Sequence, residues 1–370
     1  MKKILFVANV AKEHINKFHL PTIKELKKRG WQVDVACEAD VAVPYCDHLY
    51  AAKWKRNPFR LKTFQGVRQL KKILKEEHYD IVYCHTPVGG FVSRAACSET
   101  RKKGTKVVYF AHGLHFFDGA PKRNWIFYQI ERFLSYKTDA MFLLNDEDYL
   151  RVKREFNSNL YIKQFPGIGV DFDRISVENP IQVRKKYREK LKIKQDDIVF
   201  IYVAEVISNK NQGYLLQALK KVKETKKNVK LILVGPDHSD GKYVAMAKNL
   251  EISEDVIFTG WRNDVGELLC SADICVASSI REGFGINLVE AMYHGLPVVA
   301  VKNRGHATVI QDGENGFLVP LDNSDKMAER IIEIIENNEV REKLSHVDVE
   351  KYNALDVAGD IANTIEGLLE

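Results

Sequence analysis

Short apolar runs alternate along the chain with longer segments in which apolar residues recur every three or four positions. In the first half the short runs predict strands at Lys3–Asn9, Gln32–Cys37, Asp80–Cys84, Lys106–Phe110, Ala140–Leu144 and Leu160–Gln164. The amphipathic segments predict helices near Phe18–Arg29, Leu61–Glu77, Gly89–Lys103, Arg123–Tyr136 and Asp146–Phe156. Short buried strands between helices of this length favour an α/β fold with a parallel, doubly wound sheet.

The same alternation starts again after Phe165-Pro166-Gly167 and the charged stretch Asp173–Lys194. Strands are expected at Ile198–Ala204, Lys230–Gly235, Val256–Thr259, Ile274–Ala277, Pro297–Val301 and Gly316–Val319. Helices are expected at Asn211–Lys227, Lys242–Leu250, Val265–Ser271, Gly285–His294 and Lys326–Asn337. We therefore predict two domains, 1–166 and 167–353, and a last helix at about 354–370 that packs back on the first. Two facing sheets of this kind would leave a ligand cleft between their carboxyl ends.

Length and composition agree with two globular domains. The chain has 370 residues, of which 45% are hydrophobic and 29% charged. No apolar run approaches the roughly 18 residues of a spanning helix, and the N-terminus reads as a strand rather than a signal peptide. The six cysteines match no zinc or disulfide pattern, so reduced thiols in the cytoplasm are expected.

Charge is distributed unevenly between the two halves. The net charge is +6, but residues 1–175 hold 31 Lys and Arg against 19 Asp and Glu, whereas the remainder is net acidic. A basic first half predicts an anionic partner for that half.

The stretch Arg281–Ala291 carries the most informative chemistry. Gly283 and Gly285 allow close approach of a ligand to the backbone, and the following helix N-terminus is a ready phosphate site. Glu290 could accept two hydrogen bonds from a ribose diol, and Glu282 could reach hydroxyl groups beyond the phosphate. Together these residues indicate a bound nucleotide with a sugar attached.

This Glu-x7-Glu stretch resembles the nucleotide-sugar loop of glycosyltransferase family 4, which comprises retaining enzymes of the GT-B fold. Other segments agree: Val256–Ser279, Gly295–Val301, Asp312–Val319, His85-Thr86-Pro87, Ala111-His112-Gly113 and Pro166–Asp171. The likeness covers nearly the whole chain. It is nearest to the branch that builds bacterial capsule, exopolysaccharide and lipid-linked oligosaccharides, and it implies two facing Rossmann-like domains.

The resemblance assigns roles to matching residues. Lys210 matches the lysine that binds the donor pyrophosphate, and His112 matches a cleft histidine that contacts the donor sugar. Glu282 would bind sugar hydroxyls. Arg262 falls where the family places the nucleobase. The remaining donor-binding residues implied are Phe284, Gly285, Ile286, Asn287 and Glu290. Glu205 stands where the family often has an arginine, which leaves more of the pyrophosphate charge to Lys210 and the helix N-terminus.

The loop Asn9–Leu20 departs from the broader family because it has no glycine pair. We interpret it as an acceptor-side loop through His14, Asn16 and His19, with His115 on the same side. His14 and His19 are five residues apart, which is not a helical metal-ligand spacing, so no metal site is expected there. Asp171-Phe172-Asp173 and Asp146-Glu147-Asp148 match Asp-x-Asp, but neither is interpreted as a metal site.

Basic residues and aromatics occur together in the first half. Residues 53–75 hold nine Lys and Arg and no acid, with Trp54, Phe59, Leu61 and Phe64 between them. Residues 115–136 add Phe116, Phe117, Trp125, Phe127, Tyr128, Phe133 and Tyr136. This composition suits an anionic membrane surface, whereas no nucleic-acid recognition fold is visible. A solvated helix face over core aromatics is the alternative.

The function predicted is therefore transfer of a hexose or N-acetylhexosamine from a UDP-sugar to a lipid-linked or growing glycan acceptor. The enzyme would need no metal or other cofactor and would sit in the cytoplasm, on the inner face of the membrane. Two alternatives stay open: a nucleotide-sugar epimerase of the same fold, and a non-catalytic sugar-nucleotide-binding subunit.

Overall fold

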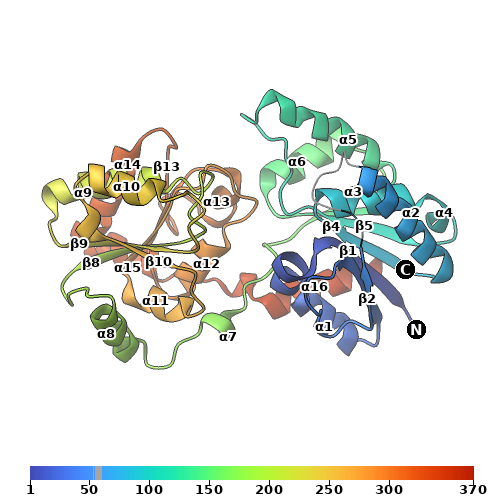
Figure 1. The fold of residues 1–370 in the computed structure, drawn as a ribbon, viewed down its shortest axis with the longest axis horizontal. Helices are drawn as coiled ribbons and strands as arrows, with labels where there is room; N and C mark the ends of the chain where they lie inside the picture. Colours follow the sequence, from blue (N-terminus) through green and yellow to red (C-terminus); the bar gives the residue numbers. More distant parts are fainter. Residues whose placement is uncertain (53, 55–60) are drawn as a thin grey trace. The chain divides into compact units, whose positions relative to one another are not determined.

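The chain folds into two α/β units, each built around one parallel sheet (Figure 1). The computed structural model describes residues 1–52, 54 and 61–370. The first unit comprises Met1–Gly169 together with Tyr352–Glu370, and the second comprises Val170–Lys351.

The first unit has a seven-stranded sheet in the order β3-β2-β1-β4-β5-β6-β7. Its strands are β1 (Lys3–Val10), β2 (Gln32–Glu38), β3 (His48–Ala51), β4 (Ile81–His85), β5 (Lys106–Phe110), β6 (Ala140–Leu143) and β7 (Tyr161–Gln164). Strands β1, β4, β5 and β6 are buried on both faces, which explains their nearly continuous apolar sequences. The strand order reverses between β1 and β4, where a ligand site is expected in an open parallel sheet.

Helices cover both faces of this sheet because right-handed crossovers leave it in opposite directions on the two sides of the reversal. They are η1 (Ala11–Asn16), α1 (Leu20–Lys28), α2 (Leu61–Glu76), α3 (Pro87–Ala96), α4 (Ser98–Arg101), η2 (Lys122–Asn124), α5 (Trp125–Ser135), α6 (Asp146–Glu155) and α16 (Ala354–Gly367). Helix α16 packs on α1, and α2 packs beside α3 in one buried apolar cluster (Figure 1).

The second unit has a six-stranded parallel sheet in the order β10-β9-β8-β11-β12-β13. Its strands are β8 (Ile198–Val203), β9 (Val229–Val234), β10 (Val256–Gly260), β11 (Ile274–Ala277), β12 (Val298–Val301) and β13 (Phe317–Val319). The strand order reverses between β8 and β11.

Its helices again cover both faces of the sheet. They are α7 (Phe172–Ile175), α8 (Pro180–Lys190), α9 (Gln212–Thr225), α10 (Lys242–Asn249), η3 (Ser253–Asp255), α11 (Val265–Ser271), α12 (Ile286–Tyr293), α13 (Arg304–Val309), α14 (Ser324–Glu336) and α15 (Asn338–Ser345). The short turn η4 (Glu350–Tyr352) leads the chain back to the first unit. Helix α9 packs on α14, and α8 packs on α11.

Every strand predicted from the sequence is present within one or two residues, but several elements differ. The single helix predicted at 89–103 is two helices, because Cys97 has a φ of −80° and a ψ of 3° and interrupts the helical geometry. The edge strand β3 and helices α8, α13 and α15 were not predicted.

None of the helices in the described residues is long and apolar enough to cross a membrane. All six cysteines are unpaired thiols. Burial raises the pKa of the Cys84 thiol to about 12, which keeps it protonated and unreactive at neutral pH.

Candidate functional site

Two charged side chains meet at the reversal of the second sheet. Lys210 lies in the loop between β8 and α9, and Glu282 lies in the loop between β11 and α12. Lys210 Nζ donates a hydrogen bond of 2.5 Å to Glu282 Oε1. Both side chains are partly exposed, at 23% and 16%, so the pair is accessible to a ligand. A lysine held by a single carboxylate at this edge is a suitable cation for an incoming phosphate group.

Hydrogen bonds fasten the two loops to each other. Ser278 Oγ donates to the Lys210 carbonyl at 2.7 Å, and the Ile280 amide donates to the Asn209 carbonyl at 2.8 Å. Asn209 Nδ2 in turn donates to the Arg281 carbonyl at 3.0 Å. Backbone groups of both loops are therefore satisfied by each other, which fixes the positions of Lys210 and Glu282.

Helix α13 supports the Glu282 loop from behind. A Cβ atom at Gly305 would lie 2.6 Å from Glu282 Cβ and 2.8 Å from its carbonyl carbon. Asn303 caps α13 and also donates to the Ser279 carbonyl at 2.9 Å. His306 is fully buried beneath the loop, and burial lowers its pKa. Only glycine at 305 allows the helix to approach Glu282 so closely.

The predicted donor-binding segment opens α12. Phe284 is buried, Gly285 is the N-cap, and Ile286 and Asn287 are the first two helical residues. The amide groups of this first turn are arranged as an anion site requires. Glu290 lies one turn further on and is 6% exposed.

Glu290 is paired rather than isolated. Arg174 on α7 donates a hydrogen bond of 2.5 Å to Glu290 Oε1. The arginine is half-exposed, whereas the carboxylate is buried. Arg174 was not predicted as part of the site. The sequence around Arg174 matches no motif, and its contact with Glu290 becomes visible only from the packing of α7 on α12.

Arg262 follows β10 and is held by Asp264. Its Nε donates to Asp264 Oδ1 at 2.7 Å, and its Nη2 donates to the other oxygen. The Arg262 guanidinium, helped by a hydrogen bond from the Tyr187 hydroxyl, holds the pKa of Asp264 at about 2. The guanidinium is therefore already occupied by the Asp264 carboxylate.

Four histidines meet at the reversal of the first sheet. His14 lies in η1, His19 precedes α1, His85 ends β4 and His112 follows β5. His14 Nε2 and His19 Nε2 are 3.3 Å apart, and the four residues place one ring nitrogen each within 4.8 Å of the other three. His19 and His85 are fully buried, and His14 and His112 partly so.

Burial lowers the pKa of all four imidazoles, that of His14 to about 4. For His19, His85 and His112 the neighbouring imidazoles lower the pKa further. The cluster is therefore neutral at physiological pH, and each ring keeps a lone pair.

The other residues predicted on this side make contacts outside the cluster. Asn16 Nδ2 donates to the Ala42 carbonyl at 2.9 Å, and the His115 ring lies 5.5 Å from that of Phe127. His19 is 1% exposed, so its side chain lies inside the predicted acceptor-side loop and not on its surface. His85 was noted in the sequence only as part of a matching segment, and its place in this cluster depends on strand order.

The prediction that His14 and His19 do not form a metal pair assumed that the segment is a regular α-helix. Residues 11–16 instead form a π-helical turn, and His19 lies beyond it, immediately before α1, so regular α-helical spacing does not describe this segment. The sequence spacing therefore does not separate these two rings.

Two family models cover most of the chain. Residues 3–145 match the model "Glycosyl transferase 4-like", and residues 183–347 match "Glycosyl transferases group 1". The chain is also 41% identical to EpsD of Bacillus subtilis (strain 168), whose full name is Putative glycosyltransferase EpsD. That alignment covers 93% of this chain and 90% of EpsD. The chain belongs to the group 1, family 4 glycosyltransferases.

Further relatives of this glycosyltransferase are more distant. It is 27% identical to the UDP-Gal:alpha-D-GlcNAc-diphosphoundecaprenol alpha-1,3-galactosyltransferase of Escherichia coli, over 87% of this chain and 85% of that one. Among solved structures, Anabaena Alr3699/HepE in complex with UDP and glucose matches with a TM-score of 0.81 at 21% identity, over 99% and 100% of the two chains. These likenesses agree with the GT-B fold expected for the glycosyltransferase.

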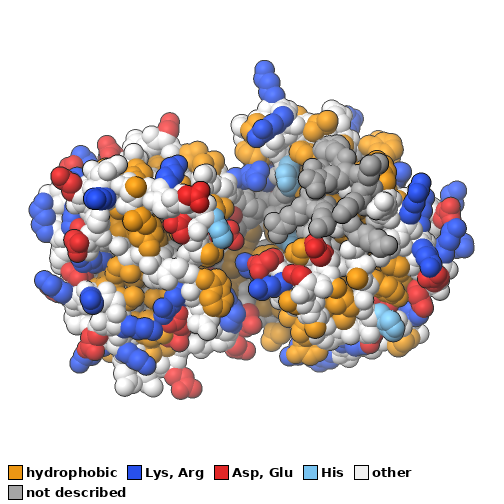
Figure 2. Space-filling model, in the orientation of Figure 1, with side chains coloured by type: hydrophobic (Ala, Val, Ile, Leu, Met, Phe, Trp, Pro, Cys, Tyr) orange, Lys and Arg blue, Asp and Glu red, His pale blue; other side chains and the backbone are white. Residues whose placement is uncertain are grey.

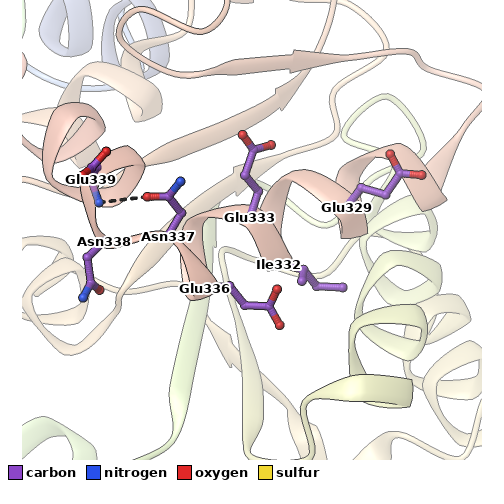
Figure 3. Close-up of a pocket in the computed structure, with 7 residues that line it drawn as sticks. All are labelled: Glu329, Ile332, Glu333, Glu336, Asn337, Asn338 and Glu339. Atoms are coloured by element: carbon purple, nitrogen blue, oxygen red, sulfur yellow. Dashed lines mark hydrogen bonds between the residues drawn. The ribbon is translucent and has the colours of Figure 1, made fainter.

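A hollow of the glycosyltransferase lies on the surface of α14 and the start of α15 (Figure 3). It is lined by Glu329, Ile332, Glu333, Glu336, Asn337, Asn338 and Glu339. Glu329, Glu333 and Glu336 pair with Lys326, Arg330 and Lys226, so three of its four carboxylates already have cationic partners. None of the predicted site residues lines this hollow.

Proposed function

We propose that the protein is a retaining glycosyltransferase that moves a hexose or N-acetylhexosamine from a UDP-sugar to a lipid-linked or growing glycan acceptor. The product would be a bacterial surface polysaccharide. The observation that carries this proposal is the Lys210–Glu282 pair at the reversal of the second sheet. The galactosyltransferase relative, which acts on a diphosphoundecaprenol-linked sugar, and the UDP-bound Anabaena structure support the donor and acceptor classes.

The second unit would bind the donor. Lys210 and the first turn of α12 would hold the diphosphate, Glu290 would accept hydrogen bonds from the ribose, and backbone groups near Arg262 would meet the base. Glu282 would leave Lys210 and accept hydrogen bonds from the sugar. In the absence of donor, Glu282 would hold the Lys210 side chain in position through the 2.5 Å hydrogen bond.

Transfer would need no metal to neutralise the donor, because Lys210 supplies a cation where charge develops on the leaving diphosphate. The acceptor oxygen forms a bond to the anomeric carbon as the bond from that carbon to the phosphate oxygen breaks. The acceptor proton passes to the departing phosphate. Attack from the face that the nucleotide leaves preserves the anomeric configuration, and His112 would contact the sugar at this step.

The first unit would bind the acceptor at a membrane surface. On and after α5, Ile126, Phe133 and Tyr136 are 54%, 62% and 63% exposed, and Lys137 Nζ lies 5.2 Å from the Phe133 ring centre. Figure 2 shows hydrophobic and basic side chains together over this end of the unit. Exposed aromatics beside lysines favour an anionic lipid surface.

Parts of the aromatic and basic segments do not belong to that surface. Trp54 is 1% exposed and donates to the Ala8 carbonyl at 2.9 Å, and Phe116 is fully buried. Both are core residues. Phe59 and the basic residues at 53, 55, 56 and 60 lie outside the described residues.

Removing the cation tests the proposal most directly. We expect Lys210→Ala and Glu282→Ala each to lower transfer about 100-fold or more, in the range seen when one preorganised electrostatic contact to a transition state is lost. Transfer of radiolabelled sugar from UDP-sugars to polyprenyl-diphosphate-linked acceptors is the measurement. Lys221→Ala on the exposed face of α9 is the matched control and should retain full activity.

Each other outcome has a defined meaning. Unchanged transfer in both variants would eliminate the proposed mechanism. An epimerised sugar formed from donor alone would identify the epimerase. UDP binding without turnover on any acceptor would identify a non-catalytic subunit.

A further inference from the structure

The spacing of the histidine cluster matches that of a metal-ligand set. Four nitrogens at about 2.05 Å from a tetrahedral zinc ion lie about 3.3 Å from one another. His14 Nε2 and His19 Nε2 are 3.3 Å apart. One ring nitrogen from each of the four histidines lies within 4.8 Å of those of the other three. The His19 and His85 ring centroids are 3.8 Å apart, so these two rings would have to turn away from each other for both to bind the ion.

Several of these nitrogens lack hydrogen-bond partners within the described part of the chain. They are His85 Nδ1, His85 Nε2 and His112 Nε2, and all three are buried. Buried polar atoms are nearly always satisfied, and leaving them unpaired is costly. A cation shared among the rings would satisfy the lone pairs that the protein itself leaves without a partner.

The chemistry of the set selects the kind of ion. The cluster contains four histidines and no carboxylate, and aromatic rings surround it, with His85 stacked on Phe6 at 5.8 Å and edge-on to Tyr83 at 4.3 Å. Neutral imidazoles suit zinc, cobalt, nickel and copper, whereas magnesium and calcium require oxygen ligands.

We propose that His14, His19, His85 and His112 bind one late first-row divalent transition ion in tetrahedral coordination. The ion would fasten the turn that follows β1 to the carboxyl ends of β4 and β5. This site goes beyond the proposed transfer reaction and is given no part in neutralising the donor. Coordination through His112 Nε2 leaves Nδ1 as the ring nitrogen available to a sugar.

A chain of neutral imidazoles that hydrogen-bond to one another is the competing arrangement. It would explain the 3.3 Å contact of His14 with His19. It would leave the lone pair of His85 without a partner, because neither nitrogen of this ring has one within hydrogen-bonding distance among the described residues, whereas an ion would accept that lone pair.

Titration with Co²⁺ distinguishes the two arrangements. The full chain is prepared without a histidine tag, treated with chelator and checked by elemental analysis. We expect one Co²⁺ per chain with the intense visible bands of tetrahedral coordination, and no thiolate charge-transfer band. Zn²⁺ should displace it and raise the Tm by roughly 5–10 °C at 100 times its dissociation constant.

Two variants assign the site. His14→Gln keeps the size and polarity of a partly exposed position and should weaken Zn²⁺ binding at least about tenfold, since even the outer partners of metal ligands are worth that much. His48→Gln, on the exposed edge strand β3, should bind like the parent. Circular dichroism checks that both variants are folded.

The titration of the unmodified protein decides the proposal even if His14→Gln fails to fold. Octahedral Co²⁺ spectra or no saturable binding would overturn it and favour the imidazole chain. Equal Zn²⁺ affinity in the parent and a folded His14→Gln would also overturn it, because the ion would then lie elsewhere.

Discussion

At the scale of single residues, the candidate donor site consists of charges that already have partners. Lys210 contacts Glu282, Glu290 contacts Arg174, and Arg262 contacts Asp264. Unpaired charges at partly buried positions would be costly, so the protein supplies a counter-charge at each position. Under the proposed function, a donor would replace the partners of Lys210 and Glu290, and its binding would be an exchange of ion pairs.

Glu290 provides a test of this exchange. The neutral amide of Glu290→Gln keeps the size of the side chain but loses charge-assisted hydrogen bonds, which are worth about 1.5–3 kcal/mol each. We expect the Kd for UDP to rise about 10-fold to 100-fold in isothermal titration calorimetry. Glu251→Gln, at an exposed position of the same unit, is the control. A Kd equal to that of the parent would show that Glu290 serves only to hold α7 through Arg174.

At the scale of elements, apolar periodicity predicts the fold well where burial is extensive. Strands β1, β4 and β8 have almost uninterrupted apolar sequences and were predicted within a residue or two. Of the elements that were missed, β3, α8 and α15 are mostly exposed, whereas α13 is only six residues long. Helix α8 buries only Tyr187 and Arg188, so it has no apolar stripe to detect, and β3 buries none of its four residues fully.

Local sequence patterns also fail to predict how residues of the candidate sites come together. Lys210 was predicted from a family resemblance and Glu282 first from the Arg281–Ala291 stretch, and they lie together because β8 and β11 are neighbours in the sheet. The histidine cluster joins residues up to 98 positions apart, from 14 to 112. No local pattern encodes that contact, because it depends on the order of β1, β4 and β5 and on the π-helical turn after β1.

The packing of α13 on the Glu282 loop leads to a prediction at this scale. Gly305→Ala would place a methyl group 2.6 Å from Glu282 Cβ, and backbone atoms on the same side leave it no room. We expect the loop to move and transfer activity to fall about tenfold or more, since small misplacements of catalytic groups are costly. Gly359→Ala is the matched control, because a Cβ there meets nothing within 4 Å. Steady-state transfer kinetics on folded protein make the comparison, and unchanged kinetics in Gly305→Ala would mean that the loop adapts without loss.

At the scale of the whole molecule, the two ends of the chain build one unit. The chain leaves the first unit after Gly169, forms the second, and returns at Tyr352. Arg29 contacts Glu366 at 2.8 Å across 337 positions of sequence, and the Trp31 indole donates to the same carboxylate at 3.0 Å. Completion of the first unit therefore requires α16, which follows the whole second unit in the sequence.

Helix α16 should accordingly contribute stability to the first unit in proportion to the apolar side chains that it buries there. Ile361 is 1% exposed on the face that packs on the unit, whereas Leu355 is 66% exposed on the same helix. Ile361→Ala should lower the free energy of unfolding by about 2–4 kcal/mol, and Leu355→Ala by less than about 0.5 kcal/mol. Urea unfolding followed by tryptophan fluorescence reports mainly on this unit, because Trp31, Trp54 and Trp125 lie in it and only Trp261 does not. Equal effects of the two substitutions on the free energy of unfolding would mean that α16 is not an integral part of the first unit in solution. The expected difference would show that residues separated by the entire second unit fold together.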